Sequence, residues 1–156
     1  DDTNPTKEEE EYVQSIEADV PLAFAWRFRT DIATWNDPPA TFELDGPFVE
    51  GTSGKTLMPG QEPIVWWIRD VQSGRSFTIE MPLKGATLRF EWHFSAVSER
   101  RTTLTQRIIL SRGAADVYRE QVQTGFAANL ATGMAKLAAS METSERAGRT
   151  LPETND

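Results

Sequence analysis

The chain has 156 residues, a net charge of −8, no cysteine and a single histidine, His93. A chain of this length suits one domain with a sizeable core. The lack of cysteine excludes a disulfide framework, a thiol nucleophile and a thiolate metal site, and one histidine excludes a multi-histidine metal site, so we expect no metal and no cofactor.

The negative charge is concentrated at the start of the chain. Residues 1–20 hold eight acidic side chains against one lysine, a local balance of −7. We interpret residues 1–9 as a flexible acidic leader, residues 10–144 as a single domain and residues 145–156 as a flexible polar tail. An acidic chain without a basic stripe argues against a nucleic-acid partner.

The hydropathy of the chain bears on its location. No apolar run approaches the roughly 20 residues of a membrane span, so we expect no integral membrane segment. We expect a cytoplasmic monomer or homodimer, and a chain that begins at Asp1 is compatible with a removed N-terminal segment.

The first predicted helix follows a β-rich stretch at residues 11–18. Asp19 is a good N-cap and Pro21 suits the first turn, so we expect a helix from about Pro21 to Trp35. The prolines of WNDPP end it. Trp35 then either fills the base of a core or closes one end of a cavity.

The middle of the chain, from Thr41 onward, has the alternating pattern and turn residues of an antiparallel sheet. A four-residue loop at 72–75, a two-residue loop at 84–85 and a three-residue connection at 98–100 set one register for the strands. Because residues directly opposite each other point to the same side, one face is apolar and Gln106 is its only central polar member. The large side chains of this inner face are Trp66, Phe77, Met81, Phe90, Trp92 and Phe94.

The outer face of the same strands is charged. The register places Glu80 opposite Arg89 and Glu91 opposite Arg107, with His93 among these charges. Such surface pairs are usually worth under about 1 kcal/mol. We therefore interpret His93 as a solvated strand residue rather than a general base, because it faces away from any enclosed space.

One segment resembles a phosphate-binding loop. GPFVEGTSGKT (46–56) ends in Gly-Lys-Thr, but the nucleotide-binding pattern requires glycine at position 49, which is valine, and a helix directly afterwards. Pro59 follows instead, so we predict no nucleotide site.

A long alanine-rich helix is predicted from about Ala115 to Ser144. Tyr118, Gly125 and Asn129 lie along one flank of its apolar face. Glycine within a helix costs about 1 kcal/mol relative to alanine, so Gly125 and Gly133 indicate that space is needed there. The space serves either close packing against the sheet or a ligand beside Asn129.

Three stretches, AWRFRTDIATWNDPP, DGPFVEGTSGK and LSRGAADVY, carry a family resemblance. With the order of elements, they make residues 11–142 resemble the SRPBCC (START-like, birch-pollen-allergen-like) superfamily, nearest its polyketide cyclase/dehydrase and lipid-transport branch. The resemblance implies an α+β helix-grip fold, in which a curved antiparallel β-sheet wraps around a long C-terminal α-helix and encloses a hydrophobic cavity. It also implies that a cyclase of this kind would carry Arg, Tyr or Asn in the cavity, and the predicted inner face of the sheet offers no Arg.

Three functions remain open. The chain binds a hydrophobic small molecule (polyketide-, lipid- or other natural-product-like), acts as a cofactor-independent cyclase or dehydratase of lyase or isomerase type, or is a co-chaperone-like interaction module. An inward Arg would favour the enzyme, a long dry tunnel the carrier, and an exposed apolar groove without a cavity the interaction module. No catalytic residue is assigned. The predicted ligand-binding residues are Trp35, Trp66, Phe77, Met81, Phe90, Trp92, Phe94, Gln106, Tyr118, Gly125, Asn129 and Gly133.

Overall fold

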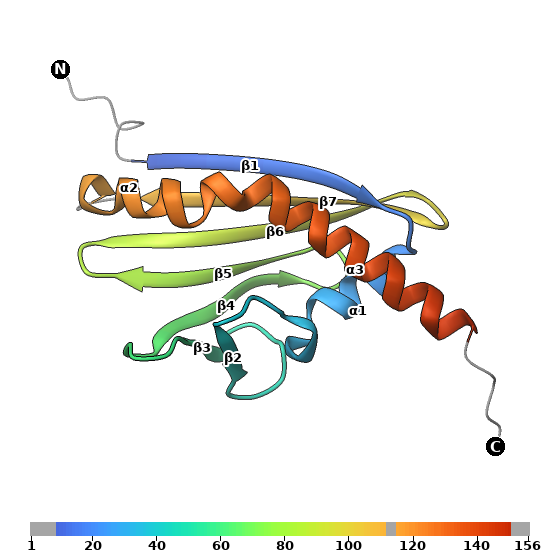
Figure 1. Ribbon diagram of the computed structural model, residues 1–156, viewed down its shortest axis with the longest axis horizontal. Helices are drawn as coiled ribbons and strands as arrows, with labels where there is room; N and C mark the ends of the chain where they lie inside the picture. The colour runs from blue at the N-terminus through green and yellow to red at the C-terminus, as the bar shows by residue number, and fades with distance from the viewer. Residues whose placement is uncertain (1–8, 112–114, 151–156) are drawn as a thin grey trace.

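A computed structural model describes residues 9–111 and 115–150 of the chain. Its described part contains a seven-stranded antiparallel sheet in the order β1-β7-β6-β5-β4-β3-β2. The helices α2 and α3 cross one face of this sheet, over β1 and β7 (Figure 1). The strands are β1 (Glu9–Ala18), β2 (Thr41–Leu44), β3 (Ser53–Leu57), β4 (Ile64–Gln72), β5 (Ser76–Leu83), β6 (Ala86–Ser98) and β7 (Arg101–Ser111).

The strand register predicted from the loop lengths is confirmed. Ile79 pairs with both Ile68 and Phe90, and Trp92 pairs with Gln106. Irregularities between Arg69 and Gln72 and between Ala96 and Ser98 absorb one residue each near the turns and leave the rest of the register as predicted. The inner face is therefore the buried one, as the 3 % exposure of Trp92 shows.

The first helix is shorter than predicted. It runs over α1 (Leu22–Arg29), and a separate 3-10 turn, η2 (Ile32–Thr34), follows it. The hydroxyl of Thr30 donates to the carbonyl of Trp26 at 2.8 Å, and the carboxylate of Asp31 accepts from the backbone N–H of Ala33 at 3.0 Å. These bonds end the helix and start the new turn, because Thr and Asp side chains compete with the helical backbone bonds.

The start of α1 also differs from the prediction. Pro21 occupies the N-cap position, with no side-chain cap, and Asp19 does not cap the helix. The backbone N–H of Asp19 instead donates to Glu142 Oε2 at 2.8 Å, which ties the end of β1 to α3.

The C-terminal helix is broken once. It consists of α2 (Ala115–Gly125), a 3-10 turn η3 (Ala127–Asn129) and α3 (Leu130–Thr150), where one helix was predicted. Phe126 leaves the helical conformation, with φ −124° and ψ −54°. Gly125, a poor helix former, precedes it and favours the break at this position.

The end of α3 lies beyond the predicted domain limit at residue 144. Glu145 is buried, and its carboxylate accepts hydrogen bonds from Arg100 at 2.6 Å and Arg149 at 2.9 Å. The bond with Arg100, followed by that with Arg149, lowers the pKa of Glu145. Residues 145–150 thus continue the helix, and Glu145 contacts the turn between β6 and β7, so the helix extends past the predicted limit. Residues 1–8 and 151–156 lie outside the described residues.

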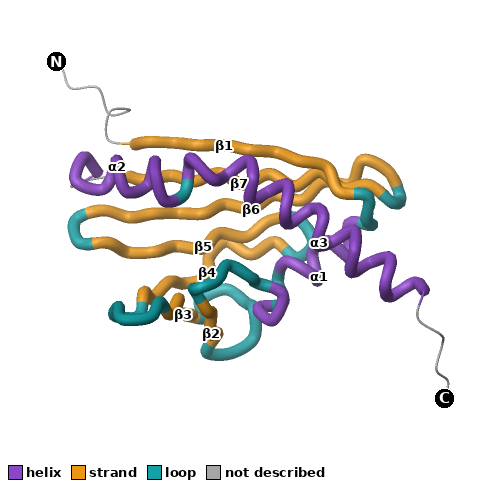
Figure 2. Tube along the Cα trace, viewed as in Figure 1, coloured by secondary structure: helices purple, strands orange, loops and turns teal. Residues whose placement is uncertain are grey.

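The loops that matter for the site gather at one edge of the sheet. Figure 2 shows the loops that join α1 to β2 and β2 to β3 together beside the β2–β3 edge. This arrangement brings the end of α1 over the inner face of β4, β5 and β6. None of the helices within residues 9–111 and 115–150 has the length and hydropathy of a membrane span.

Candidate functional site

A pocket of about 250 Å³ lies between the end of α1, the inner face of the sheet and the break in the C-terminal helix. Its lining combines aromatic and aliphatic side chains with a few polar ones. The lining residues are Arg29, Trp35, Asn36, Asp37, Phe42, Thr56, Trp66, Ile79, Met81, Phe90, Trp92, Gln106 and Phe126.

Trp35 forms one wall of this pocket. Its indole N–H donates to the backbone carbonyl of Arg29 at 2.8 Å, one of the carbonyls that the end of α1 leaves without a helical partner. The ring stacks on Trp66, with centroids 5.6 Å apart, and meets the ring of Phe42 edge-on at 5.4 Å. Trp35 therefore closes a side of the cavity, and it does so from outside the helix in which it was predicted.

Trp66 is held in place by a glycine. Gly54 in β3 pairs with Trp66 in β4, and a Cβ atom added to Gly54 would lie 2.2 Å from the Trp66 ring. The indole N–H of Trp66 donates to Thr56 Oγ1 at 3.0 Å. The Gly-Lys segment that resembled a phosphate-binding loop is thus part of a strand, and its glycine allows an indole to lie flat against the backbone.

Arg29 provides the pocket with a positive charge. Its guanidinium carbon lies 4.6 Å from the ring centroid of Trp35 and 4.2 Å from that of Trp92, so an indole lies on each side of it. Burial lowers the pKa of Arg29 to about 10, which leaves it cationic at neutral pH. Within the described part of the chain, Arg29 makes no ion pair, and its buried Nε atom has no hydrogen-bond partner.

The floor and the mouth of the pocket come from different elements. Phe90 and Trp92 of β6 supply the floor, and Gln106 of β7, which pairs with Trp92, adds an amide beside them. At the mouth, Phe126 is 40 % exposed and meets the ring of Phe90 edge-on at 5.2 Å. The break in the C-terminal helix therefore places the side chain of Phe126 at the mouth of the pocket.

Half of the predicted site residues line this pocket, and two phenylalanines of the sheet do not. Trp35, Trp66, Met81, Phe90, Trp92 and Gln106 line it. Phe77 and Phe94 are buried under α1 instead, where Trp26 contacts them edge-on at 5.8 and 5.3 Å. Strand alternation identifies the face on which a residue lies, but it does not say which part of that face a helix covers.

The predicted site residues of the C-terminal helix do not line this pocket. Gly125, Asn129 and Gly133 are exposed, and a Cβ atom at either glycine would meet nothing within 4 Å. Tyr118 does not line the pocket, and its hydroxyl donates to the carbonyl of Lys84 at 2.9 Å. The prediction assumed one continuous helix, and the 3-10 turn after Phe126 changes which side faces the sheet.

Several lining residues were missed by the sequence analysis. Arg29 follows the apolar stripe of α1, and nothing in the pattern separates it from Arg27, which is exposed. Phe126, at the mouth of the pocket, was not among the predicted site residues. The other missed residues are Asn36, Asp37, Phe42, Thr56 and Ile79.

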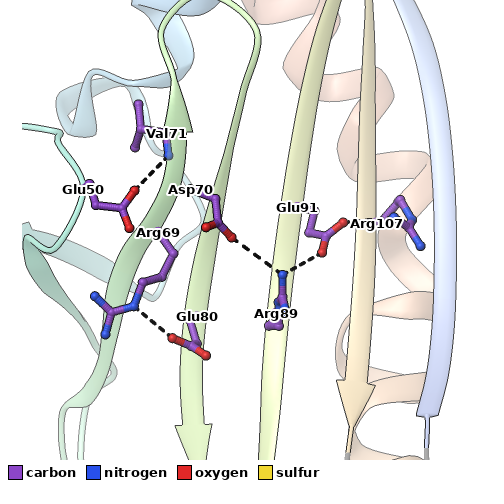
Figure 3. A network of polar contacts seen from close by, with 8 residues as sticks. All are labelled: Glu50, Arg69, Asp70, Val71, Glu80, Arg89, Glu91 and Arg107. Atoms are coloured by element: carbon purple, nitrogen blue, oxygen red, sulfur yellow. Dashed lines mark hydrogen bonds and ion pairs between the residues drawn. The ribbon is translucent and has the colours of Figure 1, made fainter.

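The outer face of the sheet carries a network of paired charges (Figure 3). Arg69 bonds Glu80 at 3.0 Å, and Arg89 bonds Glu91 at 3.0 Å and lies 3.8 Å from Asp70. Arg107 bonds Glu91 at 3.0 Å.

The network extends to β1, and its titratable residues lie outside the pocket. Arg107 also bonds Glu11, and that hydrogen bond raises the pKa of Arg107. Glu80, Glu91 and the exposed His93 all lie on this outer face, as predicted. The described residues contain no group of three or more side chains that could hold a metal ion.

No protein-family model matches the sequence, and a search of curated proteins finds no match either. Solved structures do match. The Zhui aromatase/cyclase from Streptomyces sp. R1128 has a TM-score of 0.72 at 16 % identity, over 92 % of this chain and 99 % of its own. Norcoclaurine synthase from Thalictrum flavum has a TM-score of 0.67 at 11 % identity, over 88 % and 87 %, and Ara h 8.0201 has 0.61 at 14 % identity, over 87 % and 99 %.

These similarities define the fold of the chain. It has the helix-grip fold of the START-like and birch-pollen-allergen-like proteins, as the resemblance implied. Two of these structures bear the names of enzymes, an aromatase/cyclase and a synthase, on the same architecture. Since one fold hosts many functions, the function of this chain is argued from its own pocket.

Proposed function

We propose that this protein binds a compact, flat, largely apolar small molecule in the pocket between α1 and the sheet. The supporting observation is the cavity of about 250 Å³ whose walls include the indoles of Trp35, Trp66 and Trp92. Aromatic walls with a few polar groups are what a small-molecule site requires, because the walls bind and the polar groups orient.

The size of the cavity narrows the class of ligand. Small-molecule sites span roughly 300–1,000 Å³, and this one, at about 250 Å³, lies just below that range. A system of one or two fused rings fits such a volume and can stack on the indoles. Among the predicted ligands, an aromatic or polyketide-like molecule is therefore favoured over a lipid chain.

The experiment blocks the pocket and leaves the fold intact. Met81→Trp places a larger side chain in the lining, and Val65→Trp places the same side chain at an exposed position of β4. Isothermal titration with neutral bicyclic aromatics should give saturable binding to wild type and Val65→Trp, with at least about a tenfold loss in Met81→Trp. Met81→Phe is the milder variant if the tryptophan prevents folding.

Two results would contradict the proposal. Folded wild-type protein that binds no member of a panel of bicyclic aromatics has no such site. Equal binding by folded Met81→Trp would place the binding elsewhere.

A second candidate, a cyclase or dehydratase, is favoured by Arg29. An arginine in the pocket is the feature that distinguishes the enzyme hypothesis from the carrier hypothesis, and its cation can stabilise the oxygen of an enolate as charge develops. Asp37 lines the same pocket and is the carboxylate available there as a base.

Proton exchange tests the enzyme hypothesis. An enzyme should accelerate exchange of the α-protons of an aryl 1,3-diketone with deuterated solvent, followed by NMR, and Asp37→Asn should abolish the acceleration. Exchange no faster than in buffer would contradict the enzyme hypothesis and leave ligand binding as the remaining function.

The third hypothesis, an interaction module, is supported less than the other two. It required an exposed apolar groove without a cavity, and the described residues enclose a cavity. A cytoplasmic location and a monomeric or homodimeric state stay predictions.

A further inference from the structure

Arg29 is an uncompensated charge in a site that is otherwise largely apolar. A buried charge is ordinarily paired, because removing an ion from water costs several kcal/mol. Asp37 lines the same pocket, but no ion pair joins it to Arg29, and the side chain of Arg29 makes no hydrogen bond to another described residue. The charge of Arg29 is therefore available to something that enters the pocket.

The surroundings of Arg29 determine how a partner can approach. The guanidinium carbon lies over the rings of Trp35 and Trp92, at 4.6 and 4.2 Å from their centroids, so two indoles cover part of the guanidinium. Its edge carries the N–H donors, and because the Nε atom is buried, a ligand in the pocket would meet the terminal Nη groups of this edge. The edge of a guanidinium matches the two oxygens of a carboxylate, which it can bind with two parallel hydrogen bonds.

A second polar side chain without a hydrogen-bond partner among the described residues lines the same pocket. Gln106 lines the pocket and pairs with Trp92, the residue whose ring contacts Arg29. Its side-chain amide makes no hydrogen bond to another residue of the described part. An amide donor and a guanidinium that line one pocket can both donate to an anionic oxygen group on a ligand.

We propose that the occupant of the pocket is an aromatic carboxylate, whose ring system lies against the tryptophans and whose carboxylate accepts hydrogen bonds from the edge of Arg29. This inference rests on the proposed binding function and adds the charge and the chemical group of the ligand. Arg29 is the residue that determines specificity, and Gln106 assists it.

The outer-face arginines show that an unpartnered atom alone does not indicate a ligand. The Nε atom of Arg89 is also buried without a partner, but the same guanidinium bonds Glu91 and lies 3.8 Å from Asp70. Its charge is neutralised locally. Arg29 has no such carboxylate, so an anion in the pocket is the partner that its charge lacks.

The test compares two probes that differ in charge and little in shape: 2-naphthoate and the neutral 2-acetonaphthone. Their affinities are measured by isothermal titration with wild type, Arg29→Met, Arg29→Lys and the control Arg27→Met, which removes an exposed charge from the same helix. Circular dichroism verifies that each variant is folded. Arg29→Lys keeps the positive charge but cannot make two parallel hydrogen bonds to a carboxylate. This variant remains informative if Arg29→Met fails to fold.

We expect wild type and Arg27→Met to bind 2-naphthoate at least about tenfold more tightly than the ketone. Arg29→Met should lose that preference and change its affinity for the ketone by no more than about threefold, and Arg29→Lys should keep part of the preference.

The contrary outcomes separate the two proposals. Equal affinities of wild type for both probes, or a preference that survives in Arg29→Met, would overturn the carboxylate inference and leave the binding function standing. Failure of folded wild type to bind either probe would overturn the binding function and this inference with it.

Discussion

The two faces of one sheet present arginine in opposite circumstances. On the outer face, Arg69 and Arg107 each bond a carboxylate of a neighbouring strand at 3.0 Å, and Arg89 bonds Glu91 of its own strand at 3.0 Å (Figure 3). Over the inner face, Arg29 lies between two indoles without any carboxylate partner in the described ranges. The arginines of the outer face are thus neutralised by neighbouring carboxylates. Arg29 is an unpaired cation in a pocket.

Pairing with a carboxylate distinguishes the arginines of the outer face from Arg29, whose charge is available to bind a ligand. Exposed pairs contribute little to stability, because water screens them and long side chains lose freedom on pairing. An unpaired cation in an apolar pocket lowers the stability of the ligand-free protein. Binding sites typically contain groups that are locally destabilising in this way. The comparison between the faces can be tested by substitutions that affect one face at a time.

The largest effect should come from two adjacent residues on opposite faces. Trp92 is buried below the pocket, and His93 is exposed on the outer face. Trp92→Ala should cost about 3–5 kcal/mol of unfolding free energy through the cavity it leaves, and His93→Ala less than about 0.5 kcal/mol. Urea denaturation of both variants measures this, and an exchange of the two effects would contradict the assignment of the faces.

The next effect concerns the glycine behind the pocket wall. A Cβ atom at Gly54 would lie 2.2 Å from the ring of Trp66, which is buried and has little room to move. Gly54→Ala should therefore cost about 1–3 kcal/mol through overpacking. The double variant with Trp66→Leu should recover part of this loss, because the clash requires both side chains. Additive losses in thermal unfolding would mean that the contact is not the cause.

The sheet could be predicted from the sequence because its signals are local. Loop lengths at residues 72–75, 84–85 and 98–100 and a period of two along each strand fix the register, and a slip of one residue would turn every apolar side chain outward. Two of these turns are one residue shorter than predicted, because Gln72 pairs with Ser76 and Ser98 pairs with Arg101, and the one-residue irregularity beside each turn restores the predicted register in the strands.

The site could be predicted only in part because it depends on where helices end. The side chains of Thr30 and Asp31 end α1 after Arg29, and the break at Phe126 changes the face of the C-terminal helix. A helical wheel assumes a continuous helix and gives no sign of either event. Arg29 was missed, and Gly125, Asn129 and Gly133 were misplaced, for this reason.

A smaller effect should distinguish the two kinds of arginine directly. Arg107→Met removes the partner of Glu11 and one partner of Glu91, so stability should fall by up to about 1 kcal/mol. Arg29→Met replaces an unpaired cation by an apolar side chain in an aromatic setting, so the melting temperature should stay the same or rise. Scanning calorimetry without ligand measures both, and a larger loss for Arg29→Met would mean that its contacts with the indoles stabilise the fold.

The smallest effect concerns a glycine that faces no pocket. Gly133 lies within α3, is exposed, and would place a Cβ atom in open space, unlike Gly54. Gly133→Ala should therefore raise the free energy of unfolding by about 0.5–1 kcal/mol, because alanine restricts the unfolded chain more than glycine and favours the helix. Affinity for an aromatic probe should not change, whereas a glycine that gave space to a ligand would lose affinity on substitution. A drop in binding by folded Gly133→Ala would therefore restore the helix flank as part of the site and contradict the pocket as the structure presents it.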